Sequence, residues 1–144
     1  MAIDKSGTWW VGSEAADLDE YLRAFTAEGY PADRFVRAKC TCGHDQFRLE
    51  ADPDEECAQR TCARCGISRL IADSEDHWSD AAPEPIVCPC RGRIFEVAVA
   101  FSHREDASVK WVTVGERCIE CGVLGAAADW KIDYAPTDHL YDLV

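Results

Sequence analysis

Eight of the nine cysteines in this chain of 144 residues fall into two copies of one spacing pattern. Each copy has a Cys-x-Cys pair followed by a Cys-x-x-Cys pair, with 19 residues between the pairs in the first copy and 27 in the second. Four thiolates this close along a chain can hold a zinc ion tetrahedrally, with sulfur at about 2.3 Å from the metal. The pattern therefore predicts two structural zinc sites, one formed by Cys40, Cys42, Cys62 and Cys65 and the other by Cys88, Cys90, Cys118 and Cys121.

Disulfide bonds are the main alternative use for so many cysteines. A secreted, disulfide-bonded domain normally has a signal peptide and an even number of cysteines. This chain starts with Met-Ala-Ile-Asp-Lys and has nine cysteines, so we expect two zinc ions per chain. A tetrahedral set of four sulfurs also suits a single iron ion, which is the alternative metal.

The residues around the cysteines repeat together with them. Matching places in the two copies hold Phe47 and Phe95, Arg60 and Arg117, Gly66 and Gly122, Asp73 and Asp129, and Trp78 and Tyr134. A repeat this extensive indicates that a unit of about fifty residues was duplicated, and not only a metal-binding motif. We therefore expect two modules with the same internal plan.

The spacers between the cysteine pairs have the alternating pattern of β-strands. In the second copy apolar residues alternate over 95–101, and a second strand is expected over 110–114. The first copy has a shorter version over 47–51. A third strand is expected after each Cys-x-x-Cys pair, at 67–72 and 123–128. Each module should therefore form a small three-stranded antiparallel sheet.

An amphipathic helix over about 14–28 precedes the modules, with Ser13 as its expected N-cap. Its apolar stripe consists of Leu18, Tyr21, Leu22 and Phe25. The expected fold is α+β and mostly β: two tandem modules with small sheets, plus this helix. The expected division is an N-terminal segment 1–37, a first module 38–78, a linker 79–85, a second module 86–135 and a C-terminal tail 136–144.

The two distal cysteine pairs resemble the knuckles of the zinc ribbon superfamily. The segments Cys62-Ala63-Arg64-Cys65-Gly66 and Cys118-Ile119-Glu120-Cys121-Gly122 match its Cys-x-x-Cys-Gly motif. The resemblance covers most of the chain, from Lys39 to Tyr134, and implies interaction or nucleic-acid roles. The proximal Cys-x-Cys pairs are one residue shorter than the usual knuckle, which leaves their turn geometry open.

Four cysteines per ion leave no open coordination position, so the expected metal sites are structural. The four histidines are scattered, and only His44 lies near enough to a cysteine pair to be a substitute ligand. Asp73 and Asp129 occupy equivalent positions and are expected to be turn or cap residues. We expect no catalytic residues and no enzymatic activity; an enzyme with the ribbons as its scaffold is an alternative.

The formal net charge of −12 favours a protein partner over nucleic acid, because a phosphate backbone is repelled by an acidic surface. The leading interpretation is a protein-interaction adaptor or accessory subunit, with Trp9 and Trp10 as possible anchors. The alternative is a nucleic-acid-binding regulator of transcription or translation that uses arginines near the knuckles, namely Arg60, Arg64, Arg91 and Arg93.

The remaining features constrain the setting of the protein. No apolar run approaches the roughly 18 residues that span a bilayer, so we expect a soluble, cytoplasmic protein with no membrane contact. Cys57, the ninth cysteine, lies beside Glu55 and Glu56, which should disfavour its thiolate.

Overall fold

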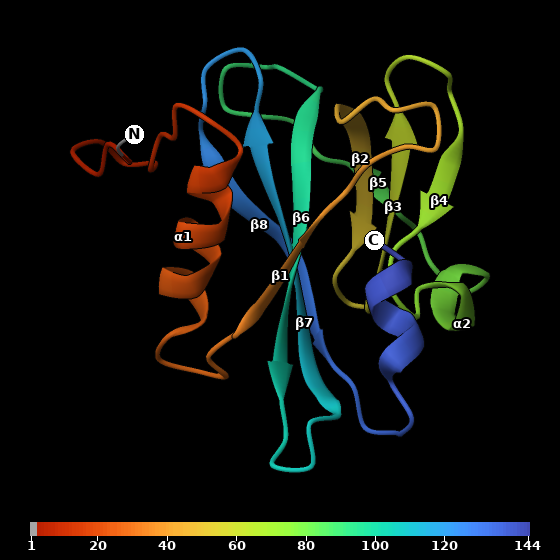
Figure 1. The fold of residues 1–144 in the computed structure, drawn as a ribbon. Coiled ribbons are helices and arrows are strands. Elements are labelled where there is room, and N and C mark those ends of the chain that lie inside the picture. Colours follow the sequence, from red (N-terminus) through yellow and green to blue (C-terminus); the bar gives the residue numbers. More distant parts are fainter. Residues whose placement is uncertain (1–2) are drawn as a thin grey trace.

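The computed structural model describes residues 3–144 and contains one eight-stranded sheet with helices around it (Figure 1). Within it the strands β4-β3-β2-β6-β7-β8 follow one another, while β1 pairs with β6 and β5 pairs with β2. All of these pairings are antiparallel. The strands are β1 (Arg34–Arg37), β2 (Phe47–Asp52), β3 (Cys57–Cys62), β4 (Ser68–Leu70), β5 (Glu84–Pro85), β6 (Phe95–His103), β7 (Val109–Cys118) and β8 (Leu124–Lys131). The helices are α1 (Ala16–Thr26), α2 (Glu75–Trp78) and the 3-10 helix η1 (Asp138–Asp142).

The three strands expected in each copy are present. They are β2, β3 and β4 in the first copy and β6, β7 and β8 in the second, and the second hairpin is longer, as the extra spacer residues require. The mostly β, antiparallel fold class is therefore confirmed. The strands of the two copies do not form two separate small sheets, however, because Phe47 of β2 pairs directly with Phe95 of β6. Both phenylalanines are fully buried in one shared core, which two separate thin ribbons could not provide.

The pairing between the two copies is reciprocal. The short strand before each proximal cysteine pair joins the hairpin of the other copy: β1 pairs with β6, and β5 pairs with β2. The registers match one to one, since Val36 lies opposite Val99 just as Glu84 lies opposite Ala51. Even the following backbone hydrogen bonds correspond, with the Ala38 N–H donating to Val97 O and the Ile86 N–H to Leu49 O, both at 2.8 Å. The two copies are thus related by an approximate two-fold rotation and exchange their leading strands.

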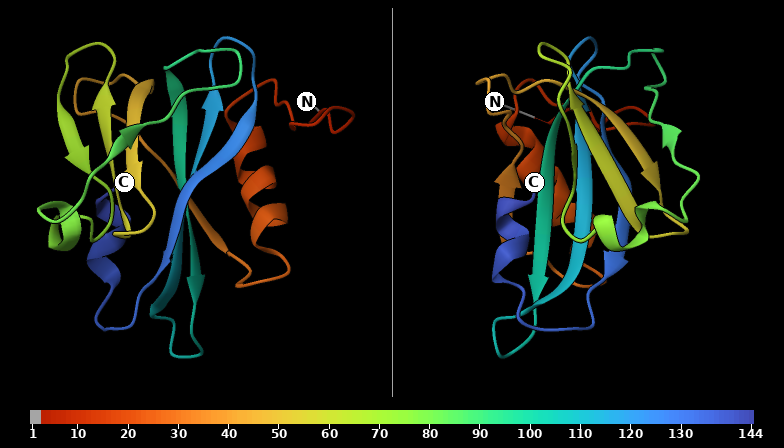
Figure 2. Two further views of the ribbon diagram at one scale, coloured as in Figure 1. Left: turned by 180° about the vertical axis from the view of Figure 1, so that it is seen from behind. Right: turned by 90° about the vertical axis from the view of Figure 1, so that its right-hand side faces the viewer.

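Because of this exchange, two segments that were expected to lie outside the modules are strands of the sheet. Residues 34–37 and 84–85 were expected to lie in an N-terminal segment and in a linker, but they occupy equivalent places as strands of the sheet. The connection through β5 crosses the side of the sheet opposite α1 and η1 (Figure 2). The tail 136–144 contains η1, which buries Leu140 in the main core.

Helix α1 covers part of the second copy with the apolar stripe that the sequence predicts. Leu18 and Leu22 are buried against Ala98 and Ala100 of β6, and a Cβ at Gly115 would lie only 2.6 Å from a methyl carbon of Leu22. The expectation that Ser13 caps the helix is wrong. The buried Asp17 side chain instead accepts hydrogen bonds from the N–H groups of Ser13 and Glu14, at 2.8 and 3.2 Å. A carboxylate inside the first turn also matches the positive end of the helix dipole.

The segment before α1 lies beside the start of β8. The Gly12 N–H donates to Gly122 O and the Leu124 N–H donates to Trp10 O, both at 2.8 Å. Arg117 Nε adds a third bond to Gly12 O at 2.9 Å. The part of the chain that the structure describes has no helix both long and apolar enough to cross a membrane.

Two equivalent glycines provide a test of this contact. Gly66 and Gly122 both have positive φ, +78° and +80°, but an added Cβ meets nothing within 4 Å at Gly66 and lies 2.4 Å from Gly12 O at Gly122. Gly66→Ala should therefore lower the free energy of unfolding by about 1 kcal/mol, the cost of a left-handed alanine. Gly122→Ala should cost clearly more, because it also displaces the N-terminal segment. Urea unfolding measures both variants, and equal losses would contradict the contact.

Candidate metal centres

The structure gathers the eight predicted cysteines into two clusters of four. We call them site 1, formed by Cys40, Cys42, Cys62 and Cys65, and site 2, formed by Cys88, Cys90, Cys118 and Cys121. In each site the sulfur atoms all lie within 4.8 Å of one another, and no histidine belongs to either cluster. Both sites lie at one end of the sheet, where β3 and β7 end, uppermost in Figure 1.

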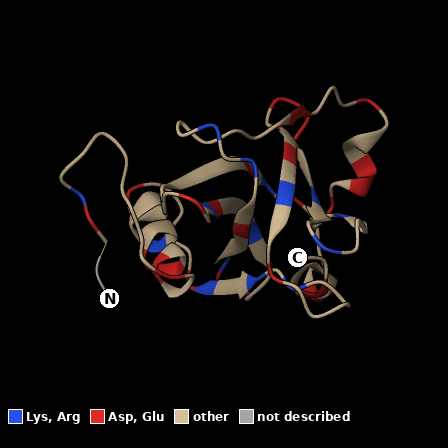
Figure 3. Cartoon of the chain, turned by 90° about the horizontal axis from the view of Figure 1, so that it is seen from above, with Lys and Arg blue, Asp and Glu red and all other residues tan. Residues whose placement is uncertain are grey.

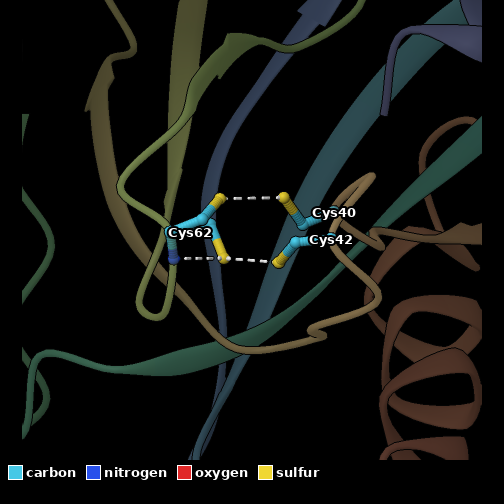
Figure 4. Close-up of side chains that lie close together, drawn as sticks. Cys40, Cys42 and Cys62 are labelled. Carbon is cyan, nitrogen blue, oxygen red and sulfur yellow. Dashed lines mark hydrogen bonds between the residues drawn. The ribbon is translucent and has the colours of Figure 1, made fainter.

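The sulfur spacing fits a tetrahedral zinc ion. In site 1 the sulfurs of Cys40 and Cys65 are 3.4 Å apart. Those of Cys42 and Cys62, both labelled in Figure 4, are 3.6 Å apart. Site 2 repeats these two distances, 3.4 Å and 3.6 Å, between the corresponding cysteines. A zinc–sulfur bond of about 2.3 Å in a regular tetrahedron gives sulfur–sulfur edges of about 3.8 Å. Only a small expansion of either cluster would therefore be needed to hold the ion.

The distal pairs have the knuckle geometry that the resemblance implies. The Cys62 N–H donates to Ile67 O at 2.9 Å, and the Gly66 N–H closes the turn on Cys62 O at 3.0 Å. The N–H groups of Arg64 and Cys65 both point at the sulfur of Cys62, at 3.4 Å. The second copy has the same two backbone bonds. Such N–H groups stabilise a thiolate and fix its direction.

The proximal Cys-x-Cys pairs form a different but equally regular turn. The Cys40 N–H donates to His44 O and the Gly43 N–H donates to Cys40 O, both at 2.8 Å, with φ of +93° at Gly43. This is a three-residue hairpin loop that ends in a left-handed residue. The second copy uses the same turn, although its left-handed position holds Arg91, with φ of +73°. The shorter spacing is therefore compatible with a metal-binding turn.

The thiols of the two sites have different acidities. The backbone N–H of Cys42 is the main cause that lowers the pKa of Cys40, to about 6. Burial raises the pKa of Cys62, but the N–H groups of Cys65 and Arg64 outweigh it and the net shift is downward. In site 2, burial raises the pKa of Cys88. In site 1 itself, the Ile67 backbone lowers the pKa of Cys65, but burial and the side chains of Cys40, Cys62 and Cys42 outweigh it and raise that pKa to about 12. Metal binding requires the thiolate form, which the backbone N–H groups favour at Cys40 and Cys62.

The strand register corrects one match in the repeat. Arg60 and Arg117 appear equivalent in the sequence, but Arg60 lies opposite Leu49 while Glu116 lies opposite Val97, the equivalent of Leu49. The partner of Arg60 in the second copy is therefore Glu116. The sequence comparison missed this because Arg60 precedes its cysteine by two residues and Arg117 precedes its own by one.

Arg60 and Glu116 occupy equivalent positions but differ in their contacts. Arg60 is only 4% exposed, lies over the Phe47 ring at 4.6 Å and donates from Nη2 to Val144 O at 2.7 Å. Burial raises the pKa of Glu116 to about 8. Its Oε1 is inaccessible to solvent and has no hydrogen-bond partner among residues 3–144.

The other ionisable candidates from the sequence have structural partners. Asp73 accepts hydrogen bonds from Trp130 Nε1 at 2.9 Å and from Tyr134 Oη at 3.0 Å, and Asp129 accepts one from Trp111 Nε1 at 3.2 Å. Cys57 is fully buried. Burial is the main cause that raises the pKa of Cys57, and the carboxylates of Asp52 and Glu55 raise it further. The thiolate is therefore disfavoured, as expected, but mainly by burial and not by the neighbouring carboxylates.

One network of hydrogen-bonded side chains was not predicted from the sequence. His103, at the end of β6, hydrogen-bonds to Asp33 through Nδ1 and to Tyr141 Oη through Nε2. The Arg34 guanidinium lies 3.7 Å from the centroid of the Tyr141 ring. These residues are up to 108 positions apart and belong to no recognisable motif. They fasten η1 to β1 and β6.

Basic side chains gather near the metal sites. Ten of the 15 basic residues lie within six sequence positions of a site cysteine, against six of the 27 acidic residues. These counts leave +4 near the cysteines and −16 elsewhere, which add to the net charge of −12. Figure 3 looks down on this end. Seven of the ten basic side chains are exposed and have no ion pair among residues 3–144. One of them, Arg34, lies over the Tyr141 ring, and the other six are Lys39, Arg48, Arg64, Arg69, Arg91 and Arg93.

Two cavities flank the metal end. One of about 390 Å³ lies next to site 1, with Arg37, Lys39 and Arg64 on its rim and Leu18 in its lining. The other, of about 410 Å³, lies between α1 and the start of β8. Its lining includes Trp9, Tyr21, Phe25, Val87 and Glu116.

No family model, no curated protein and no solved structure matches the chain.

Proposed function

We propose that this chain is a zinc protein of the zinc-ribbon type, with two structural sites, and that it acts as a protein-interaction adaptor or accessory subunit in the cytoplasm. The observation that carries the proposal is the meeting of four thiols in each cluster, with sulfur spacings close to those of a zinc tetrahedron. Zinc is preferred over iron, and the proposed modules comprise residues 38–78 and 86–135, each preceded by its exchanged strand, β1 or β5.

The proposed role of the metal is to close the end of the fold. Cys40, Cys42, Cys88 and Cys90 lie on the proximal turns, and the other four ligands lie at the ends of β3 and β7 or just after them. A bound zinc ion would act as a cross-link with all four positions filled by protein. No water would be activated there, which supports a non-enzymatic protein. The occupied hydrogen bonds of Asp73 and Asp129 support the same view.

Removing one ligand should test the metal proposal. The wild-type chain should carry two zinc ions, and Cys65→Ser or Cys121→Ser should each carry about one fewer, by native mass spectrometry and metal analysis. Because the copies exchange strands, each variant should still unfold in a single transition with a lower free energy of unfolding. Oxidised cysteines without metal in the wild type would contradict the proposal.

The surface proposed for a protein partner is the aromatic cavity beside α1. Trp9 and Phe25 are 54% and 50% exposed there, while the neighbouring Trp10 is partly buried and makes an edge contact with Tyr21 at 5.8 Å. The two tryptophans therefore divide the roles expected of them: Trp10 covers the core and Trp9 remains available as an anchor. Exposed aromatic residues around a cavity are typical of protein-binding surfaces.

Truncating the anchor should weaken partner capture. Trp9→Ala and Phe25→Ala should each reduce recovery of a bound protein from native lysate several-fold, because buried aromatic anchors carry much of the binding energy. Tyr30→Ala is the matched control, since Tyr30 is also exposed, at 44%, but does not line this cavity. Quantitative mass spectrometry of the recovered proteins measures the effect. Equal recovery with all three variants would argue against this surface.

A second candidate is nucleic-acid binding by the metal end. It is favoured by the six exposed, unpaired basic side chains that surround the cysteines in an otherwise acidic chain. Two zinc–tetrathiolate centres, each at −2, would offset the local charge, which supports ranking this candidate below protein binding.

Salt dependence distinguishes this second candidate. If it is right, single-stranded or duplex oligonucleotides should bind at low salt and dissociate steeply as salt is raised, because bound counterions are released. Arg64→Gln and Arg91→Gln should reduce the salt slope by about one each. Lys131→Gln, a change at the far end of β8, should leave it unchanged. Fluorescence anisotropy provides the measurement, and no binding at low salt would exclude the candidate.

A further inference from the structure

The two metal sites have the same ligands but opposite charges at equivalent positions. The strand register makes Glu116 the partner of Arg60. In the same way, Arg64 and Glu120 each lie between the two cysteines of a distal pair. Copy 1 therefore has arginine where copy 2 has glutamate, at two places beside the metal ligands.

Arg60 is placed to stabilise the charge of site 1. Its guanidinium is buried on Phe47, the residue paired with Cys62, and Nη2 lies 3.5 Å from the carbonyl oxygen of Lys39, the neighbour of Cys40. Nε and Nη1 are buried without a hydrogen-bond partner among the described residues. Burial lowers the pKa of Arg60, and the thiolates of Cys40 and Cys62 oppose that shift, which is the direction of attraction. A fixed positive charge in a poorly solvated place stabilises a doubly negative zinc–tetrathiolate centre.

Among the described residues no cation occupies the equivalent position beside site 2, and the charge of Arg117, next to Cys118, is paired with Glu96 at 2.6 Å. Glu116 occupies the position of Arg60, and neither of its protonation states is positive. Glu120 lies against the cluster, because a Cβ at Gly92 would be 2.4 Å from Glu120 Oε2, 2.9 Å from the Cys118 sulfur and 3.2 Å from the Cys90 sulfur. The nearby Arg91 and Arg93 are exposed, so solvent and salt screen them more strongly than they screen the buried Arg60.

Solvent exposure of the cysteines would predict a different order of metal loss from the two sites than their charges do. The first cysteine of each pair is buried in both sites. Cys65 of site 1 is exposed, whereas its equivalent Cys121 is only partly exposed. Exposure alone would therefore make site 1 the more labile site, and the charge difference predicts the reverse order.

Site 2 is also the site joined to the N-terminal segment. Its distal turn holds that segment through the bond from the Gly12 N–H to Gly122 O, and Arg117, next to Cys118, bonds to Gly12 O. The equivalent glycine of site 1, Gly66, has no atom within 4 Å of the place a Cβ would take. A change in the turn of site 2 would therefore reach the segment that carries Trp9 and Trp10.

On these grounds we infer that site 1 keeps its metal permanently, that site 2 is exchangeable, and that occupancy of site 2 controls the docking of the N-terminal segment 9–12. The inference rests on the proposed zinc binding. It adds a regulatory role: metal loss at site 2 would release the segment that carries Trp9 and Trp10 from the sheet while site 1 still holds its own turns together.

Stepwise metal removal from the wild-type protein tests the order in which the two sites lose their metal. The zinc stoichiometry is measured first, so that a chain without two zinc ions counts against the proposed function and not against this inference. A chelator is then added to the two-zinc protein in the presence of iodoacetamide, and peptide mass spectrometry identifies the cysteines that become alkylated. Cys88, Cys90, Cys118 and Cys121 should be modified first, in step with the loss of the first ion. Simultaneous modification of both sites, or earlier modification of site 1, would overturn the inference.

Variants of Arg60 test whether its buried charge causes the difference in metal retention between the two sites. Arg60→Met should speed zinc loss from site 1 by about tenfold or more, since it removes a buried charge next to the thiolates. Arg60→Lys keeps the charge and should retain most of the difference between the sites. Arg69→Met is the matched control, because Arg69 lies opposite Arg60 in β4 but is exposed. If Arg60→Met and Arg69→Met have the same effect on zinc loss, the charge explanation is wrong; the wild-type order remains decisive if Arg60→Met does not fold.

Hydrogen exchange tests the link to the N-terminal segment. In the one-zinc species the amides of Gly12 and Leu124 should lose protection, while those of Cys40 and Cys62 should keep it. Unchanged protection at Gly12 and Leu124 after loss of the first ion would overturn the coupling. The same experiment on Gly66→Ala, a change in the turn of site 1, should give the wild-type pattern at Gly12.

Discussion

The reciprocal exchange of leading strands is the interaction on which the rest of this structure depends. Strand β1 completes the hairpin of the second copy and β5 completes that of the first, around the pairing of Phe47 with Phe95. Each copy alone would be a thin ribbon with little core, since so small a unit buries too little apolar surface. The exchange places both hairpins on one core and both cysteine clusters at one end of the sheet.

The elements outside the two-fold repeat make the two halves structurally different. Helix α1 packs on the second copy and on the exchanged strand β1, the segment before it lies beside β8, and η1 is fastened by His103 and Tyr141. The site that bears the N-terminal segment is also the one with glutamates beside its cysteines. The duplicated frame thus provides two similar four-cysteine clusters, and the parts outside the repeat give one of them a connection to the exposed Trp9.

Much of the candidate site could be predicted because its signals are local. Ligand spacing, the glycine after each distal pair and the alternation in 95–101 all act over a few residues, where backbone geometry leaves few choices. The turn at Arg91 had no such signal, since its left-handed residue is not glycine. Strand exchange was also invisible, because β5 is only two residues long and its partner lies more than thirty residues away. The match of Arg60 with Arg117 failed because a shift of one residue turns a side chain to the other face of a strand.

The sequence by itself determined the eight clustered cysteines, the two hairpins with their third strands, and the helix with its apolar stripe, because each follows from spacing or periodicity along the chain. The tertiary structure decided which strand completes which hairpin, which charges face each cluster, and where the N-terminal segment lies. These depend on contacts between distant residues, such as Val36 with Val99 and Gly12 with Gly122. Many such pairings have similar local propensities, and only burial of one shared core selects among them.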